Sequence, residues 1–349
     1  MEEKQPILSI CIPTYNRRDV IVRDVHNYLS VQDSRFCVKV LDNYSTDGTH
    51  NALLDIRDER LIVRQNERNI GGTNNVMKSL KNTQSKYVML ILDKDGINVD
   101  YLKKYIDFLE ISNPDWGYIN FHCSVVTNPD VFPSGVNAIR NSSAYQPRHP
   151  SGFFVKSELY KEATDDGILE GTQDFLFPLE LVQLYLALHY DCVNVNIPLI
   201  IDSNVRNTNS FGSYTYDERN CWFSPTKCNQ YYQVFSNKIC EMMPNVDEKK
   251  CILEEMTTSM TNAVSKRFRI WMNSDEICRH YHLKKRNVSL IEMISNLKII
   301  MNSYYSVAKT YNSFDRKYYH KRWIKDLKSC TKFVLKEMIK GKQQVLVRI

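Results

Sequence analysis

The sequence has few features typical of exported or membrane-spanning proteins, or of proteins stabilised by bound metal. No stretch reaches the roughly 18 uninterrupted apolar residues that a membrane helix needs. The first six residues, MEEKQP, hold no basic stretch followed by an apolar one, so we expect no signal peptide. The ten cysteines form no Cys-x-x-Cys unit, and only Cys221 and Cys228 stand out as a pair for a bond or a metal. For a chain of 349 residues, which is large enough to bury a sizeable core, reduced thiols in a cytoplasmic protein are the simplest explanation.

Two common phosphate-binding signatures are also missing. The sequence holds neither G-x-G-x-x-G nor G-x-x-x-x-G-K-[ST]. These patterns mark dinucleotide-binding folds and P-loop nucleotide hydrolases. Neither class is therefore indicated, although other patterns in the sequence suggest a nucleotide.

Acidic residues are scarce near the C-terminus. From Arg279 onward the only carboxylates are Glu292, Asp315, Asp326 and Glu337, against a long series of Lys and Arg, while the whole chain has a net charge of +6. Such a region indicates an anionic partner: a phospholipid surface, a nucleic acid or an acidic polymer. In residues 317–339, aromatic and aliphatic residues are mixed with the basic ones, which suits an interfacial helix on an anionic membrane. A solvated basic helix face is the alternative.

The first half of the chain alternates short apolar runs with helical patterns. Residues 7–12, 36–41, 61–64 and 87–92 read as strands, and amphipathic stretches lie between them. This alternation predicts an α/β fold with a parallel, doubly wound sheet. Polar loops follow most of these strands, and in a parallel sheet such loops meet at one edge, where ligands bind.

The fourth run ends in Asp93-Lys94-Asp95-Gly96. Two carboxylates one residue apart at the end of a buried strand suit a hard divalent cation that also takes phosphate oxygens. A plain polar turn is the alternative, since Asp and Gly are common turn residues.

Four motifs follow one another in the first 100 residues: 9–17 (SICIPTYNR), 41–49 (LDNYSTDGT), 69–72 (NIGG) and 93–95 (DKD). In this order they resemble a family 2 glycosyltransferase. The resemblance covers about the first 100 residues clearly and extends more weakly to roughly residue 210. It implies the GT-A nucleotide-sugar-binding fold, a mainly parallel sheet flanked by helices, and inversion at the anomeric carbon.

The resemblance also implies roles for individual residues. Asp95 would ligate Mg²⁺ or Mn²⁺ bridging the diphosphate, and Asp93 would face the ribose or a metal-bound water. Lys94 stands where the family often has an acidic or small residue, which reduces the local negative charge. The nucleotide-binding positions would be Pro13, Thr14, Tyr15, Asn16, Asp42, Asn43, Asn69, Gly71 and Gly72. Asn43 replaces a frequent Asp, yet its side-chain oxygen can still accept from uracil N3–H, so uridine fits.

The general base would come later in the chain. Asp174, just before an apolar helix at 178–189, matches the family's position for this residue, and Glu170 is the reserve candidate. A carboxylate there also caps a helix, which is the structural alternative. Residues 127–150, rich in Pro, Asn and Ser, are predicted to form a long active-site loop.

The predicted organisation is a GT-A catalytic domain over residues 1–212 and a basic, mainly helical region over 213–349. The predicted function is transfer of a sugar from a UDP-sugar to an acceptor hydroxyl on a surface-glycan precursor. A lipid-linked glycan acceptor and peripheral contact with the inner face of the cell membrane are expected, and no nucleic acid. The alternatives are a nucleotidyltransferase, or a non-catalytic protein that binds nucleic acid or membrane through the basic tail.

Overall fold

The computed structural model describes residues 5–121, 123–142, 149–172, 175, 177–201, 218–219 and 221–346. These residues fall into two compact units: the first holds the described residues up to Ile201 except Phe175, and the second holds Phe175 and the described residues from Glu218 onward. The predicted domain boundary at residues 212 and 213 lies outside the described residues and stays a prediction.

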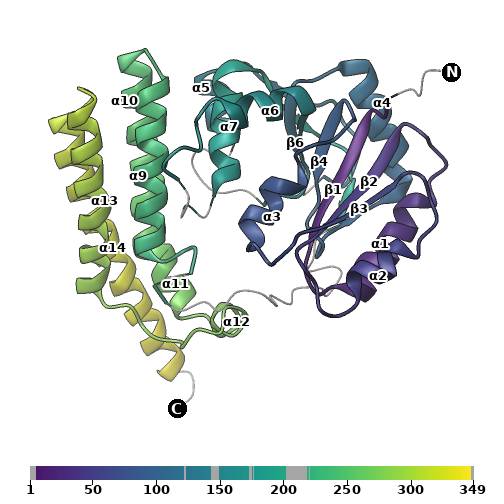
Figure 1. Cartoon of the computed structure of the whole chain (residues 1–349). Coiled ribbons are helices and arrows are strands. Elements are labelled where there is room, and N and C mark those ends of the chain that lie inside the picture. Colours follow the sequence, from purple (N-terminus) through teal and green to yellow (C-terminus); the bar gives the residue numbers. More distant parts are fainter. Residues whose placement is uncertain are drawn as a thin grey trace. The chain divides into compact units, whose positions relative to one another are not determined.

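Four parallel strands form one half of the main sheet in the first unit (Figure 1). In the order β3 (Leu61–Gln65), β2 (Phe36–Asp42), β1 (Leu8–Thr14) and β4 (Tyr87–Leu90), each pairs in parallel with its neighbour. Every residue of β1, β2 and β4 is buried, as expected for strands covered on both faces, whereas the edge strand β3 is partly exposed. Their carboxyl ends therefore lie at the same edge of the sheet.

Helices α1 (Arg18–Leu29), α2 (Thr49–Leu54) and α3 (Gly72–Ser79) connect these strands. The 3₁₀ turn η1 (Val99–Tyr101) and helix α4 (Leu102–Ser112) follow β4. Apolar residues of α1 and α4, among them Val25, Tyr28 and Ile106, join a core cluster with Ile10 of β1 and Val38 of β2. Apolar positions at helical spacing thus bury one face of each helix, as the sequence predicts.

The other half of the sheet is mixed in direction. Beyond β4 the order is β8 (Phe153–Lys156), β6 (Trp116–Ile119), β9 (Cys192–Val195) and β7 (Asp130–Phe132). Strand β8 is antiparallel to both β4 and β6, β7 is antiparallel to β9, and β6 and β9 are parallel. The expected mainly parallel sheet is confirmed, but the sequence did not indicate the antiparallel strands β7 and β8, because an apolar run reads the same in either direction and does not encode strand orientation. Strands β5 (Gly96–Ile97) and β10 (Ile200–Ile201) form a separate antiparallel pair.

The prediction of one long loop over residues 127–150 is wrong in part. This segment contains β7 and helix α5 (Val136–Asn141), and residues 143–148 lie outside the described part. Strand β7 has only three residues, too few to show a period in the sequence. Helices α6 (Ser157–Asp165) and α7 (Pro178–His189) complete the first unit, and α7 has the bounds that the sequence predicts.

The second unit is helical, as expected. It contains α9 (Pro225–Met242), α10 (Val246–Asn262), the π-helical turn η2 (Ala263–Arg267), α11 (Phe268–Met272), α12 (Asp275–His280), α13 (Leu290–Thr310) and α14 (Arg316–Leu346). The side chains of Ser224, Asn245 and Ser289 cap α9, α10 and α13 by accepting backbone N–H groups of the first turn. None of the described helices is both long and apolar enough to cross a bilayer.

Candidate functional site

Side chains from the ends of β1 and β4 meet at Asp93. The Thr14 hydroxyl donates to Asp93 Oδ2 at 2.9 Å, and the Arg17 guanidinium lies with Nε 3.6 Å from Asp93 Oδ1. Residue 14 ends β1, which pairs with β4 in register, so the fold brings these loops together across 79 residues of sequence. Arg17 was not among the predicted site residues, although it directly follows the predicted nucleotide loop.

Opposing influences act on the Asp93 carboxyl. Burial raises the pKa of Asp93 above its ordinary value, and the nearby Asp95 adds to that rise. The Arg17 guanidinium, the Thr14 hydroxyl and the Tyr15 backbone N–H act in the opposite direction, because each favours the ionised carboxylate. The two acids are close enough for their charges to repel, which is a condition that a bound cation relieves.

Asp95 lies deeper than Asp93. Its side chain is fully buried, whereas the Asp93 side chain is 17% exposed. The Ser151 hydroxyl donates to Asp95 Oδ2 at 2.5 Å and accepts from the Leu92 backbone N–H at 2.9 Å. His149 Nε2 is 3.4 Å from the same carboxylate oxygen. The chain segment before β8 therefore contacts the predicted metal ligand directly. His149 lies within the predicted active-site loop 127–150, but neither Ser151 nor His149 was named as a site residue.

The first residues of the loop after β1 hold the loop after β2. Asn16 has the left-handed backbone conformation (φ 52°) that Asn tolerates better than most residues. Its backbone N–H donates to Ser45 Oγ, and its side-chain oxygen accepts from the Thr46 N–H, both at 2.8 Å. Pro13 is buried and Tyr15 is half-buried. The predicted nucleotide loop 13–16 is thus fixed to its neighbour by hydrogen bonds.

Asp42 stabilises the loop that follows it. Its buried carboxylate accepts from the Ser45 backbone N–H, from the Ser45 hydroxyl and, at 2.8 Å, from the Gln65 amide. These bonds connect the ends of β2 and β3. They also give Asp42 a structural role beside the predicted contact with the nucleotide.

An asparagine network connects the loops after β2 and β3. Asn43 Nδ2 donates to Asn69 Oδ1 at 2.9 Å, while Asn43 Oδ1 accepts from Asn66 Nδ2 and the Ile70 N–H, both at 3.0 Å. Asn69 Oδ1 also accepts from the N–H of Gly71, whose φ of +82° suits a residue without Cβ. Gly72 then begins α3. Asn43, Asn69, Gly71 and Gly72, all predicted site residues, therefore come together in the fold.

The predicted general base is not placed by the structure. Asp174 lies outside the described residues, and Glu170, the reserve candidate, is exposed and follows the turn at Gly167. All ten cysteines are free thiols, so Cys221 and Cys228 form no disulfide. In the described part of the chain, no three His, Cys, Asp or Glu side chains cluster closely enough to form a metal site on their own.

Comparison with known proteins gives the family of this region. Residues 9–145 match the family model described as Glycosyl transferase family 2. The chain is 32% identical over 111 residues to the Bacillus subtilis (strain 168) "Putative teichuronic acid biosynthesis glycosyltransferase TuaG", a match that covers 31% of this chain and 44% of TuaG. It is 25% identical over 134 residues to the Escherichia coli "UDP-Glc:alpha-D-GlcNAc-diphosphoundecaprenol beta-1,3-glucosyltransferase WfaP", which covers 38% of this chain and 53% of WfaP. The chain thus spans about half the length of these curated relatives.

A solved structure extends the likeness in fold. S. aureus TarS 1–349 in complex with UDP-GlcNAc superposes with a TM-score of 0.52, covering 88% of this chain and 91% of that one at 18% sequence identity. At this identity the likeness concerns the fold alone, and it confirms the expected α/β architecture with a C-terminal helical region. Residues 9–145 are a family 2 glycosyltransferase domain, as the order of their motifs predicted.

Proposed function

We propose that this protein transfers a sugar from a UDP-sugar to an acceptor hydroxyl on a surface-glycan precursor. The observation that carries the proposal is that Asp93 contacts the end of β1 and the loop after it. That loop is hydrogen-bonded to the loop after β2, which is in turn bonded to the loop after β3, all at one edge of the sheet. Ligands of open α/β sheets bind at this edge. The family match and the activity named for WfaP support a nucleotide-sugar donor.

The carboxylates at this edge fit a divalent cation, Mn²⁺ or Mg²⁺. Asp93 and Asp95 offer hard oxygen ligands, and the charge of Asp95 adds to the rise in the pKa of Asp93 that burial causes. Together they would hold the cation, and the His149 imidazole, whose Nε2 is 3.4 Å from Asp95 Oδ2, lies beside them. When bound, the cation would neutralise the charge that gathers on the leaving diphosphate.

Other residues of the chain would orient the donor and take the proton of the acceptor. The asparagine network and the Asn16–Ser45 bonds hold the loops rigid around the nucleoside, so that the donor is bound in one orientation. Arg17 positions Asp93 through its ion pair. Asp174 would take the proton of the acceptor hydroxyl as its oxygen attacks the anomeric carbon, and the bond to the nucleoside diphosphate breaks on the opposite face, with inversion.

The acceptor belongs to the same proposal. The names of the relatives refer to a teichuronic acid and to a diphosphoundecaprenol-linked sugar. We infer that the acceptor here is a glycan or a lipid-linked glycan, used by a cytoplasmic protein at the inner face of the membrane.

A thermal-shift screen of nucleotide sugars, with and without Mn²⁺, tests the donor. A UDP-sugar that binds only the folded protein raises the unfolding midpoint. We expect Asp95→Asn to weaken Mn²⁺-dependent UDP binding by roughly tenfold or more, because one metal ligand loses its charge. The exposed Asp55→Asn serves as the control with unchanged binding.

Asp174→Asn is expected to abolish transfer while UDP affinity stays within about twofold, because a base acts only in the reaction step. Full transfer by this variant would remove Asp174 from the role of base. Consumption of a nucleoside triphosphate with release of pyrophosphate, and no binding of any nucleotide sugar, would instead identify a nucleotidyltransferase.

A further inference from the structure

One face of helix α14, its inner face, packs against other helices of the second unit. Trp323, Cys330, Phe333 and Val334 pack into a cluster with residues such as Phe268 and Leu297. The two acidic residues of the helix are also engaged. Asp326 is buried and paired with Arg322, and Glu337 accepts from Arg269 Nε at 2.7 Å.

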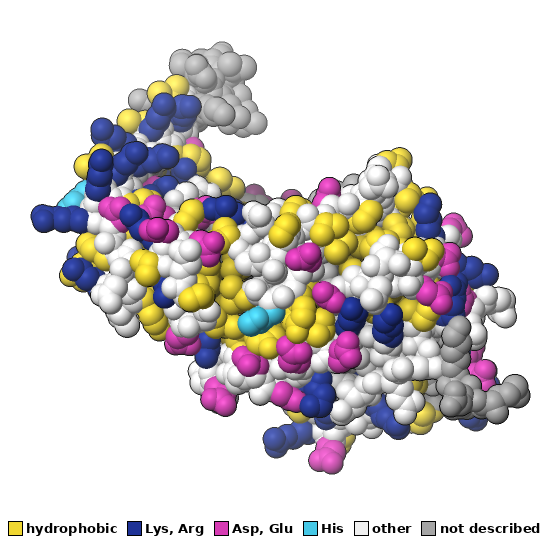
Figure 2. Space-filling model, turned by 90° about the horizontal axis from the view of Figure 1, so that it is seen from above, with side chains coloured by type: hydrophobic (Ala, Val, Ile, Leu, Met, Phe, Trp, Pro, Cys, Tyr) yellow, Lys and Arg dark blue, Asp and Glu magenta, His cyan; other side chains and the backbone are white. Residues whose placement is uncertain are grey.

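The opposite face of α14 is exposed and of one charge. At 100° per residue, nine exposed side chains fall within an arc of about 120° along a length of about 33 Å. Six are lysines and three are aliphatic: Lys317, Lys321, Lys325, Lys328, Lys332 and Lys336, with Ile324, Leu335 and Ile339. We call this set the basic face. Figure 2 shows Lys and Arg side chains together with hydrophobic ones on the part of the molecule that carries this helix.

The basic face has no partner in its own unit. Among the residues that the structure describes, no carboxylate forms an ion pair with any of the six lysines, and the sequence of the helix contains no acidic residue besides Asp326 and Glu337. Ile324, Leu335 and Ile339 are 51%, 54% and 58% exposed, so the aliphatic side chains lie in solvent between the charges. Both the positive charges and the aliphatic side chains of the basic face are therefore available to bind an external surface.

We propose that the basic face of α14 docks the protein on an anionic lipid bilayer, with the six lysines at the phosphate level and the three aliphatic side chains in the interface. Lysine rows attract any polyanion, including nucleic acid. Unlike a nucleic acid, a bilayer also offers a place for aliphatic side chains, because burying them in its interface removes apolar area from water. The inference does not depend on sugar transfer, since it uses no residue of the candidate site.

Co-sedimentation of the full chain with vesicles tests this docking. Vesicles of phosphatidylcholine and phosphatidylglycerol are expected to bind the protein in low salt. Vesicles of phosphatidylcholine alone should bind it at least about tenfold more weakly. Lys321→Glu/Lys328→Glu should reduce binding to the anionic vesicles by about tenfold or more. Lys103→Glu/Lys104→Glu on α4, which makes the same change in net charge at exposed positions, should leave binding nearly unchanged.

A second variant separates the membrane from other polyanions. Ile324→Asn/Leu335→Asn keeps every charge and should weaken vesicle binding several-fold, while binding to a single-stranded oligonucleotide stays the same. Circular dichroism verifies that each variant is folded. The proposal is overturned if the chain ignores anionic vesicles, if both charge variants behave alike, or if the aliphatic variant binds vesicles as well as the parent does.

Discussion

Ser151 is the residue through which the chain before β8 supports the predicted metal ligand. Its hydroxyl accepts from Leu92 N–H and donates to Asp95, so one side chain fixes both the end of β4 and the carboxylate that follows it. A single hydroxyl with two partners in a buried site has more effect than its size suggests, because removing it leaves two polar groups to find new partners.

We therefore expect Ser151→Ala to destabilise the protein by about 1–3 kcal/mol and to weaken Mn²⁺-dependent UDP binding. Urea unfolding and calorimetric titration with UDP measure the two effects. Ser157→Ala is the matched control, because the Ser157 hydroxyl donates to the Ser85 carbonyl at 2.7 Å. It should cost stability alone, and an equal loss of UDP affinity in both variants would contradict the positioning role of Ser151.

Glu180 is a second residue whose environment has a measurable consequence. It lies in the first turn of α7 and is buried, and burial raises the pKa of its carboxyl from 4.5 to about 8, opposed by its own backbone N–H. The folded protein therefore holds a proton on Glu180 over a pH range in which the unfolded chain has lost it.

The sign of the pH dependence follows from this difference. Because the folded state binds more protons than the unfolded state between about pH 4.5 and 8, the contribution of Glu180 to stability falls as pH rises through that range. Glu180→Gln removes this loss, so we expect the variant to be about 2–4 kcal/mol more stable than the parent at pH 8 and similar at pH 4. Urea unfolding at several pH values measures the difference. The exposed Glu158→Gln on α6 should have the same pH profile as the parent.

At the scale of elements, the junction of β6, β8 and β9 depends on close backbone approach. Gly117 of β6 lies opposite Phe154 of β8 and Val193 of β9. A Cβ at residue 117 would overlap the Val193 carbonyl oxygen and lie 3.0 Å from the Phe154 ring. The sheet at this point has room for a glycine only.

Gly117→Ala is thus expected to destabilise the protein by about 3 kcal/mol or more, since either the strands separate or the backbone shifts. Gly135→Ala is an informative comparison. Gly135 has φ +86° and open space where a Cβ would lie, so alanine there costs only the strained backbone, about 1 kcal/mol. Thermal unfolding ranks the two variants, and equal losses would mean that strand spacing is not what Gly117 provides.

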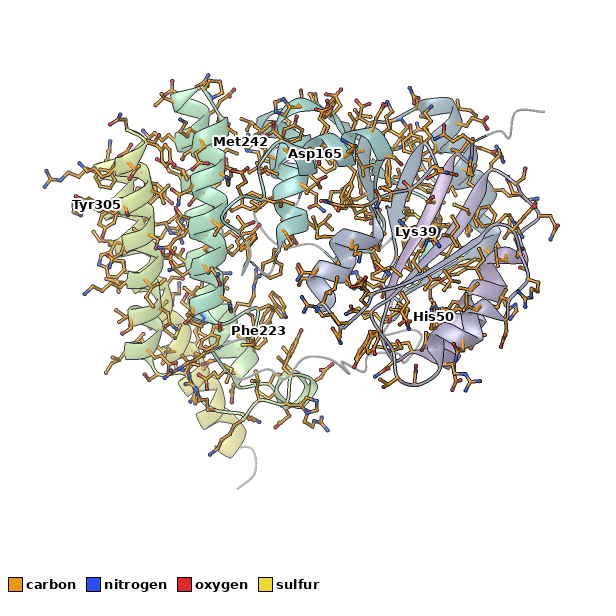
Figure 3. All side chains as sticks on the ribbon, viewed as in Figure 1. Lys39, His50, Asp165, Phe223, Met242 and Tyr305 are labelled. Carbon is orange, nitrogen blue, oxygen red and sulfur yellow. The ribbon has the colours of Figure 1, made fainter. Side chains whose placement is uncertain are left out.

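At the scale of the whole molecule, stability comes from packing without covalent links. Figure 3 shows side chains filling the space between the sheet and helices of the first unit and among the helices of the second. All ten cysteines are free: Cys251 is exposed, Cys123 is partly exposed and the others are buried. Burial raises the pKa of several of them, for instance Cys11 and Cys228, each to about 12.

Thiol titration should reflect this arrangement. A thiolate is the reactive form, so a disulfide reagent at pH 8 should modify Cys251 quickly, Cys123 more slowly and the buried thiols only on unfolding, when all ten react. Dithiothreitol should not change the unfolding temperature. A drop in that temperature on reduction would reveal a stabilising disulfide and contradict the free-thiol arrangement.

The sequence by itself determined the parts of this protein that depend on local order. The apolar run 87–92 identified a buried strand because burial on both faces leaves no polar position in the run. The run 36–41 accommodates the buried Lys39, whose Nζ donates to the Lys81 carbonyl. Both ends of helix α7 were predicted correctly, because Pro178 begins an apolar stretch and polar residues follow its end at His189. The order of the four motifs identified the family 2 domain, since each motif is a contiguous piece of chain.

The tertiary structure alone decided which residues complete the site and which way the later strands run. Ser151 and His149 contact Asp95 across more than 50 residues, and such a contact has no signature near either residue. Strand β8 is antiparallel to β4 because of the path that the chain takes between them, which an apolar run does not record. The resemblance implied different roles for Asp93 and Asp95, but only their neighbours in the fold make the Asp93 side chain partly accessible and bury that of Asp95.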